Sequence, residues 1–423
     1  MLITVMAVFF FLLVLGMPIA FCMSLSAAVA VLTNAALPAT IIAQKIYTAV
    51  DSVSFVAIPL FMMAGSLMNS TGITDKIIAF FKNLVGHITG GLAHTVVLTG
   101  MLMAGVSGSS VADAAAISTI MVPQLEKNGY DRGFACALVS SAGSLGPIIP
   151  PSIIMIVYSG VVSIAVGKLF MAGVIPGVIL GIMMLVYCYI YAKDHGMKRG
   201  TFAGWKAVGK SFLRSFGALI MPLIIIGGIV LGICTATESG ILAIIYGIIY
   251  GFATKELTVK KLWKSIEESV AGTVQPMIII SFASLLAYIL TYYDMGTVVG
   301  NFMSSVTSNG TVVLFLIFAI IFIAGMFIES TAILLMLVPF FSPLIAVYGF
   351  NPIHFATVCI ISLVLGGITP PVGIVMYVVS GVTQTDLKRI IAHIWPFIII
   401  FSIGVLLVIF VPQVSTWLPG LLS

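Results

Sequence analysis

The sequence predicts an all-α polytopic membrane protein built from two structural repeats, each with a re-entrant helical hairpin and a broken helix. Of its 423 residues, 61% are hydrophobic and only 7% are charged, whereas a soluble domain carries about 25% charged residues. Glycines and prolines recur at a fixed offset between the two halves, and polar segments interrupt the apolar stretches at corresponding places. The solvent around most of this chain is therefore lipid, and its plan is duplicated.

The apolar stretches are long enough to cross a bilayer. A spanning helix needs roughly 20 apolar residues, and the chain offers about ten to twelve such stretches. Among them are 6–32, 170–192, 216–236, 311–328 and 390–412. The first is longer than the apolar core of a signal peptide and has no charged segment before it, so we expect it to be retained. Residues 1–32 could form one long helix or two short ones.

The net charge of +5 comes largely from basic residues between the apolar stretches. They form no soluble basic face, so a nucleic-acid partner is not expected. Segment 193–214 contains Lys193, Lys198, Arg199, Lys206, Lys210 and Arg214. A second basic segment contains Lys255, Lys260, Lys261 and Lys264. The positive-inside rule places both in the cytoplasm, so an even number of spans must separate them. The stretch 216–236 and a shorter one ending near Phe252 would provide two.

The basic linker 193–214 lies near the middle of the chain, which prompts a search for a repeat. Adding 220 to a position in the first half gives seven matched glycines or prolines: Gly105 and Gly325, Pro123 and Pro343, Gly129 and Gly349, Gly146 and Gly366, Pro150 and Pro370, Pro151 and Pro371, and Pro176 and Pro396. We therefore predict a first repeat over 1–192 and a second over 215–423. Many transporters use this plan, with binding sites near the membrane midplane where the repeats meet.

Each repeat contains a polar segment that a lipid-facing helix would not carry. In the first it is GVSGSSVADAAA, residues 105–116, and in the second it is residues 325–335. Non-helical backbone at membrane depth is tolerated only where protein or a watery cavity satisfies its polar groups. We therefore predict two re-entrant hairpins, with the first tip near 107–110 and the second near 329–331.

A glycine- and proline-rich break follows each hairpin, at 140–152 (SSAGSLGPIIPPS) and at 363–373 (LVLGGITPPVG). Proline removes a helix hydrogen bond, and glycine permits unusual backbone conformations, so both segments should interrupt a spanning helix. The freed carbonyls and nearby hydroxyls suit a small hard cation. The N-terminus of the following half-helix would attract a carboxylate. Two matched breaks beside two matched hairpins favour a functional site over simple helix kinks.

Acidic residues near or within the apolar stretches are functional candidates, because burying them is costly. Asp51 and Asp294 adjoin polar residues near span ends and fit an interfacial position. Glu238, in TATESG, fits the first turn of a capped helix. Asp113 and Glu329 belong to the hairpins and could coordinate a cation, relay protons or cap a helix. The apolar core lacks lysine and arginine except near span ends, so a carboxylate substrate would depend on helix termini, hydroxyls or a bound cation.

Four segments resemble the large membrane subunit of tripartite ATP-independent periplasmic (TRAP) transporters, the DctM-like family. They are GVSGSSVADAAAI from residue 105, NGYDRGFACALVSSAGSLGPIIPPSIIMIVY from residue 128, TATESG from residue 235 and GGITPPVGIVMYV from residue 366. The resemblance implies an elevator-type, sodium-coupled importer of organic acids in the bacterial inner membrane, with sodium as the coupling ion and no other cofactor. It also implies a DctQ-like small membrane subunit of four helices and a periplasmic substrate-binding protein.

The resemblance also implies positions for the two kinds of ligand. Sodium is expected at the tips and breaks, at Ser107, Gly108, Ser109, Ser110, Gly143, Gly146, Pro147, Glu329, Ser330, Thr331, Gly366, Gly367 and Thr369. The organic acid is expected between them, at Asp113, Ser144, Pro150, Pro151, Ser152, Pro370, Pro371 and Gly373. C4-dicarboxylates, sialic acid, other sugar acids and keto acids all remain candidates.

Three other functions are alternatives to a transporter that works with partner subunits. An intramembrane enzyme is disfavoured, because the chain has no HExxH and no GxSxG. A passive channel would show a short filter repeated through oligomer symmetry. A stand-alone cation-coupled dicarboxylate carrier is the main alternative, since the same hairpins would serve without partners. The five cysteines lie in apolar surroundings without CxxC spacing, so neither disulfides nor a zinc site is expected.

Overall fold

The structure is a computed structural model that describes residues 1–197, 199–202 and 204–421. Lys198 of the basic linker and the last two residues lie outside the described part. Within it the chain is all-helical, as predicted, with no β-strand. The first half contains α1 (Leu2–Val14), α2 (Ile19–Thr33), α3 (Thr40–Val50), α4 (Val53–Ser70), α5 (Ile73–Val85), α6 (Gly91–Ser107), α7 (Ser110–Lys127), α8 (Arg132–Gly143), α9 (Ile153–Val162) and α10 (Val166–Asp194).

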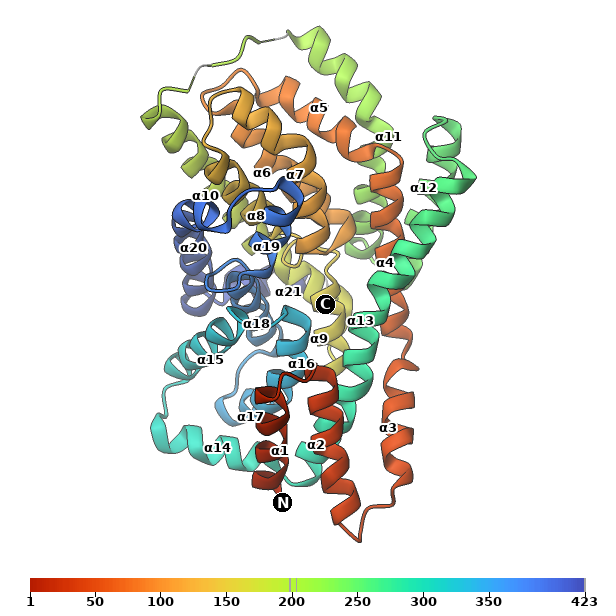
Figure 1. Cartoon of the computed structure of the whole chain (residues 1–423), viewed down its shortest axis with the longest axis vertical. Coiled ribbons are helices and arrows are strands. Elements are labelled where there is room, and N and C mark those ends of the chain that lie inside the picture. The colour runs from red at the N-terminus through yellow and green to blue at the C-terminus, as the bar shows by residue number, and fades with distance from the viewer. Residues whose placement is uncertain (198, 203, 422–423) are drawn as a thin grey trace.

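The second half follows the basic linker, although its first helix already begins at Trp205, within the segment 193–214 that was predicted as linker. It contains α11 (Trp205–Val230), α12 (Ala236–Ala253), α13 (Val259–Tyr292), α14 (Met295–Val306), α15 (Gly310–Gly325), α16 (Ser330–Phe341), α17 (Pro343–Tyr348), α18 (Pro352–Gly367), α19 (Ile374–Thr383), α20 (Leu387–Phe410) and α21 (Gln413–Leu421). In Figure 1, α5 to α8 lie in the upper part and α14 to α17 in the lower part, while α4 and α13 run alongside.

Several apolar stretches fold as two short helices rather than one long one. Among the described residues, five helices are each long and apolar enough to cross a membrane, or up to seven if each of two bent pairs is one span. The stretch 6–32 is an example, because α1 ends at Val14 and α2 begins at Ile19. Gly16 takes a left-handed conformation with φ +79°, and Pro18 precedes α2. These residues end one helix and start the next, so the N-terminal segment is two short helices.

Two helices, α11 and α12, separate the basic linker from the second basic segment, and each is long and apolar enough to span the membrane. This matches the even number of spans that the positive-inside rule requires. Helix α12 begins with a capping box, in which the Thr235 hydroxyl accepts from the Glu238 amide and the Glu238 carboxylate accepts from the Thr235 amide at 2.7 Å. The interpretation of Glu238 as a capping residue is thus confirmed.

Similar local structures recur in the two halves. Asp131 caps α8 by accepting from the amides two and three residues further on, and Asn351, 220 residues later, caps α18 in the same way. The hydroxyl of Ser159 donates to the Ile164 carbonyl, as Ser380 donates to Thr385. The Pro150–Pro151 and Pro370–Pro371 peptide bonds are both cis.

The two halves interlock around the breaks. The second hairpin helix of the first half, α7, packs against α19, which follows the break of the second half. Helix α16 packs in turn against α9, which follows the break of the first half. Helix α13 contacts α2, α3, α4 and α16. Each hairpin is therefore held by its own half and by the other half, with α13 and α4 alongside.

The close contact between α15 and α18 predicts different effects at two adjacent glycines. A Cβ at Gly366 would lie 2.5 Å from the Gly325 Cα, whereas a Cβ at Gly367 would meet only the Ser330 hydroxyl at 3.7 Å. Gly366→Ala should lower the free energy of unfolding by about 1–3 kcal/mol through overpacking. Gly367→Ala should be neutral or slightly stabilising, because alanine favours the helix.

Thermal unfolding of both purified variants in detergent, beside the unsubstituted protein, measures this difference. Equal melting temperatures for the two variants would contradict the proposed contact between the backbones of α15 and α18.

Candidate functional site

The first hairpin tip is a tight turn that rests on the first break. Helix α6 ends at Ser107, Gly108 takes a left-handed conformation with φ +62°, and the Ser109 hydroxyl caps the start of α7. A Cβ at Gly108 would lie 2.5 Å from the Pro151 carbonyl oxygen. Glycine is needed here for both the conformation and the close approach. The tip therefore packs directly on the break.

Asp113 lies behind this tip, in the first turn of α7, and is fully buried. Its Oδ1 accepts a hydrogen bond from the Ser107 hydroxyl at 2.6 Å. Its Oδ2 is buried and has no hydrogen-bond partner among the described residues. Gly146 of the first break is adjacent, since a Cβ there would lie 2.9 Å from Oδ2. A buried carboxylate oxygen without a partner is costly, so this position favours a compensating proton or cation.

The first break spans the residues between α8 and α9. Gly143, the last residue of α8, approaches α7 so closely that a Cβ would lie 2.6 Å from the Ala114 nitrogen. The Ser152 hydroxyl donates to the Pro147 carbonyl at 2.6 Å and accepts from the Met155 amide at 3.2 Å, which caps α9. These side-chain bonds replace part of the interrupted helix ladder.

The second tip is capped by a carboxylate instead of a hydroxyl. Glu329 precedes α16, and its Oε2 accepts from the Ala332 amide at 3.1 Å. Its Oε1 accepts from the Thr331 hydroxyl at 2.9 Å. Of the roles considered for Glu329, capping is therefore observed. A negative charge at this helix N-terminus is also favourable electrostatically.

The second break lies between α18 and α19 and is bonded to the second tip. The Val372 amide donates to the Met326 carbonyl at 3.2 Å. Within the break, the Thr369 hydroxyl donates to the Leu365 carbonyl at 2.7 Å, and Gly373 takes a positive φ of 56°. Tip and break are thus in direct contact in the second half, as they are in the first.

A cavity of about 330 Å³ lies between the two tips and against α4 and α13. It brings together seven of the residues predicted for cation binding: Gly108, Ser109, Ser110, Pro147, Glu329, Ser330 and Thr331. No lysine or arginine is among the described residues that line it. The cavity wall therefore offers hydroxyls, the first turns of α7 and α16, and one carboxylate.

The other predicted site residues do not line this cavity. In the first half these are Ser107, Asp113, Gly143, Ser144, Gly146, Pro150, Pro151 and Ser152, and in the second half they are Gly366, Gly367, Thr369, Pro370, Pro371 and Gly373. Most belong to the packed layer in which tips and breaks meet. Asp113 in particular lies behind the first tip, not between the tips where the substrate was expected.

Helices α4 and α13 contribute residues that the sequence interpretation missed. Met62 lines the cavity from α4, and Gly272, Gln275, Pro276 and Ile279 line it from α13. Gln275 had a detectable signal, because it is a polar side chain within an apolar stretch, directly before a proline. Polar groups in spans are costly and mark functional positions. Asp51 and Asp294 lie at helix ends, away from this cavity.

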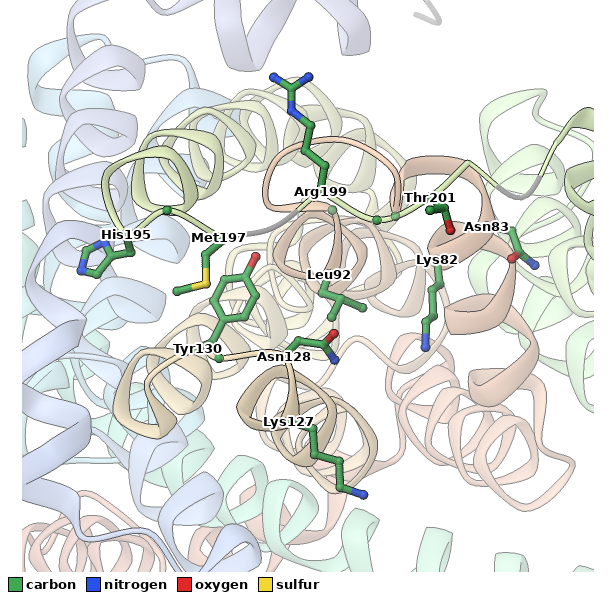
Figure 2. A pocket seen from close by; sticks show the side chains of 15 residues that line it. Lys82, Asn83, Leu92, Lys127, Asn128, Tyr130, His195, Met197, Arg199 and Thr201 are labelled. Carbon is green, nitrogen blue, oxygen red and sulfur yellow. The ribbon is translucent and has the colours of Figure 1, made fainter.

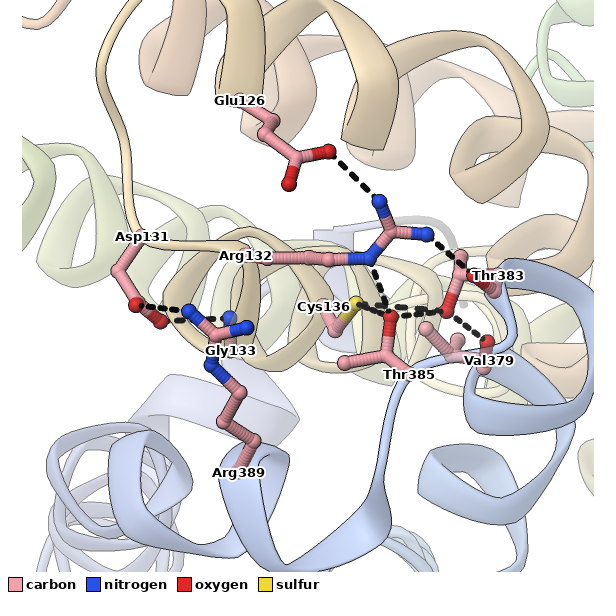
Figure 3. A network of polar contacts seen from close by, with 9 residues as sticks. All are labelled: Glu126, Asp131, Arg132, Gly133, Cys136, Val379, Thr383, Thr385 and Arg389. Atoms are coloured by element: carbon pink, nitrogen blue, oxygen red, sulfur yellow. Dashed lines mark hydrogen bonds and ion pairs between the residues drawn. The ribbon is translucent and has the colours of Figure 1, made fainter.

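A polar network joins the start of α8 to the segment that connects α19 with α20 (Figure 3). Arg132 Nη1 pairs with Glu126 at 2.6 Å, its Nε donates to the Thr385 hydroxyl at 2.9 Å, and its Nη2 donates to the Thr383 carbonyl. Beside it, Arg389 pairs with Asp131 at 2.9 Å. Hydrogen bonds and ion pairs therefore join α8, which leads into the first break, to the end of α19, which leads out of the second, and to α20.

Known proteins are similar to this chain over nearly its whole length. Residues 6–414 match the family model described as Tripartite ATP-independent periplasmic transporter, DctM component. The chain is 34% identical to the C4-dicarboxylate TRAP transporter large permease protein DctM of Pseudomonas aeruginosa, over 90% of each chain. It is 33% identical to the sialic acid TRAP transporter large permease protein SiaM of Vibrio cholerae, over 96% of this chain and 95% of that one.

The fold is similar to that of a solved transporter. The crystal structure of the Alcanivorax borkumensis YdaH transporter matches with a TM-score of 0.69, covering 90% of this chain and 89% of that one. The sequence identity is 14%, so the likeness concerns the fold alone.

The Asp131 ion pair predicts a pH-dependent contribution to stability. Partial burial raises the pKa of Asp131, but the hydrogen bonds from Arg389 and from the backbone amides of α8 outweigh this, and the net pKa is below its usual value. Because the pKa is lower in the folded state, the ionised Asp131 stabilises the fold at pH values above the unfolded-state pKa, near 3.9. This contribution is lost as the pH falls through the folded-state pKa.

Asp131→Asn keeps a good helix cap but removes the charge. We expect it to lower stability by about 0.5–1 kcal/mol at pH 7, a value limited by solvent exposure. The difference should persist to pH 5 and shrink below about pH 4. Thermal unfolding of both proteins across this pH range measures it. A difference that is independent of pH would show that the ion pair with Arg389 does not carry the effect.

Proposed function

The chain belongs to the DctM family, the large permease component of TRAP transporters, and from this premise we propose that it imports a small organic acid by sodium-coupled symport. Members of this family are multi-pass permeases of bacterial inner membranes and not enzymes. We propose that a periplasmic binding protein delivers the substrate and that a DctQ-like small membrane subunit completes the complex. A C4-dicarboxylate or sialic acid is a suitable substrate class, in line with the names of the relatives.

The cavity between the two hairpin tips carries this proposal. A carboxylate entering it would meet the first turns of α7 and α16 and the hydroxyls of Ser109, Ser110 and Ser330. Helix N-termini attract anions through their amides and dipoles. Glu329 lies in the same cavity, however, and would repel an anionic substrate. A cation near the tips would offset that repulsion, so the charge balance supports the proposed coupling to a cation.

The proposed cation positions use the tips and breaks. In the first half, the unpartnered Oδ2 of Asp113 lies beside Gly146 and behind Ser107. In the second half, Glu329 and Thr331 meet at the tip. Sodium prefers oxygen ligands, and carboxylates, hydroxyls and freed carbonyls are the groups present at both places. A compact cation is favoured because the glycine contacts leave little room.

We propose that the two halves are structural repeats and that the transporter works as an elevator. The matched caps and hydroxyl bonds of the two halves support the first part. For the second, the hairpins and breaks form one interlocked unit, while the cavity lies on its boundary with α4 and α13. The lining residues on those two helices are all uncharged, which suits a boundary along which two parts slide.

Uptake into proteoliposomes tests the proposal. The full chain would be reconstituted with its small subunit, and uptake of radiolabelled succinate, sialic acid and a keto acid would be measured with and without binding protein and an inward sodium gradient. We expect uptake of one of these acids to require both. Uptake without the binding protein would support the alternative of a stand-alone carrier, and uptake independent of sodium would overturn the proposed coupling.

Asp113→Asn tests the first cation position separately. Removing the buried charge should raise the sodium concentration that gives half-maximal uptake by about tenfold or more, equivalent to roughly 1.4 kcal/mol of lost binding. It should also reduce the stabilisation by sodium in thermal unfolding. Asp294→Asn is the matched control, because Asp294 is exposed, lies away from the cavity and has a left-handed backbone that asparagine tolerates. Unchanged sodium dependence in Asp113→Asn would exclude Asp113 from the cation site.

A further inference from the structure

A second and larger cleft, of about 760 Å³, lies near the start of the basic linker (Figure 2). Its walls come from the end of α5, the start of α6, the loop between α7 and α8, and residues 195–197 and 199–201 after α10. None of the residues that line the cavity between the tips belongs to it. The transport mechanism proposed above gives this cleft no role.

The cleft is positively charged. Lys82, Lys127 and Arg199 line it from three different segments, and no aspartate or glutamate is among its described lining residues. Figure 2 shows Arg199 and Lys127 on opposite edges, with their charged ends extending outward, and Lys82 to one side of them. Lys82 donates to the Gln124 amide oxygen at 3.2 Å and Arg199 to the Thr89 hydroxyl at 2.8 Å, which are both neutral acceptors. In the described part of the chain, none of the three forms an ion pair with a carboxylate.

Neutral hydrogen-bond donors complete the cleft. The first two residues of α6, Gly91 and Leu92, line it, so the positive end of a 17-residue helix is directed toward it. The side chains of Asn128 and Tyr130 lie on the same wall. Burial raises the pKa of Tyr130 to about 12, so its hydroxyl remains protonated. The cleft thus combines a helix N-terminus and neutral donors with three exposed cationic side chains on its rim. Such a combination is the chemistry that recognises an anion with several oxygens.

The surroundings of the cleft indicate on which side of the membrane it lies and at what depth. It shares residues 195–197 and 199–201 with the basic linker, which the positive-inside rule places in the cytoplasm. Phe202 and Trp205, 42% and 76% exposed, follow immediately, and Phe202 packs against His87 with ring centroids 4.7 Å apart. Exposed aromatic residues of this kind occur at the level of lipid headgroups. Basic pockets at this level are suited to anionic phosphate groups.

We propose that this cleft binds a phosphate-bearing anion on the side of the membrane that carries the basic linker. The phosphate could be presented by an anionic phospholipid headgroup or by a soluble phosphate ester, since both offer the same oxygens. A bound phosphate would connect α5, the start of α6 and the α7–α8 loop to the linker. It would thereby fix the linker against the first half of the protein and stabilise the folded state.

The test compares two triple variants that remove the same charges. Lys82→Gln, Lys127→Gln and Arg199→Gln together neutralise the cleft. Lys206→Gln, Lys210→Gln and Arg214→Gln also remove two lysines and one arginine, but these exposed residues lie on α11 outside the cleft. Both variants and the unsubstituted chain, each with its small subunit, would be titrated with inorganic phosphate at constant ionic strength. In parallel they would be titrated with phosphatidylglycerol or phosphatidylcholine in mixed micelles.

Thermal unfolding and native mass spectrometry would report binding. We expect phosphate or phosphatidylglycerol to stabilise the unsubstituted chain and the α11 variant, and to bind the cleft variant at least about tenfold more weakly. Stabilisation by phosphatidylglycerol alone would identify the lipid source, and stabilisation by inorganic phosphate would identify a soluble one. Equal losses in both triple variants, or no stabilisation by either probe, would overturn the proposal.

Folding of the variants is checked by the melting temperature without added probe. The three cleft residues are exposed, so we expect little change. If the triple variant melts early, the single variants Lys127→Gln and Arg199→Gln provide the same comparison against Lys210→Gln.

Discussion

The structure depends on one constraint, which is that a backbone polar group inside a bilayer must find a partner within the protein. This chain interrupts helices at two tips and two breaks, and it satisfies the freed groups by packing tips against breaks. The Val372 amide bonds to the Met326 carbonyl in one half, and Gly108 rests on the Pro151 carbonyl in the other. Glycine occurs where these backbones come closest, because any side chain would separate them.

The same constraint fixes the electrostatics of the cavity between the tips. Ending a helix inside the protein leaves the N-termini of α7 and α16 facing a shared space, and these supply partial positive charge without any lysine or arginine. Glu329 caps one of the two helices and adds a full negative charge. The cavity wall thus combines fixed partial positive charges with one carboxylate.

Contacts between the halves keep the two tips at a defined separation. Helices α7 and α16 each pack on a half-helix that belongs to the other half. Arg132 and Asp131 join the start of α8 to the region around α20. A displacement of one hairpin alone would break the packing contacts of α7 with α19 or of α16 with α9. The proposed motion of both hairpins as one unit against α4 and α13 would preserve them.

Much of this architecture could be predicted from the sequence. Low charge and long apolar stretches determined a helical membrane protein, and the glycines and prolines marked both tips and both breaks, because these residues act on the local backbone wherever they occur. The capping role of Glu238 was equally local. The separation of residues 1–32 into two short helices was left open, since an apolar stretch allows either arrangement and Gly16 with Pro18 permits but does not require a break.

Only the tertiary structure decided which of the marked residues face the cavity. Ser109, Ser330 and Glu329 line it. Asp113 instead lies behind the first hairpin tip, and Gly366 packs against Gly325. Gln275 and Met62 join the site from helices distant in sequence. The sequence by itself thus determined where the helices end at the tips and breaks, because those ends depend on neighbouring glycines, prolines and capping residues. The packing of the two halves determined what those ends face, because that depends on contacts between residues hundreds of positions apart.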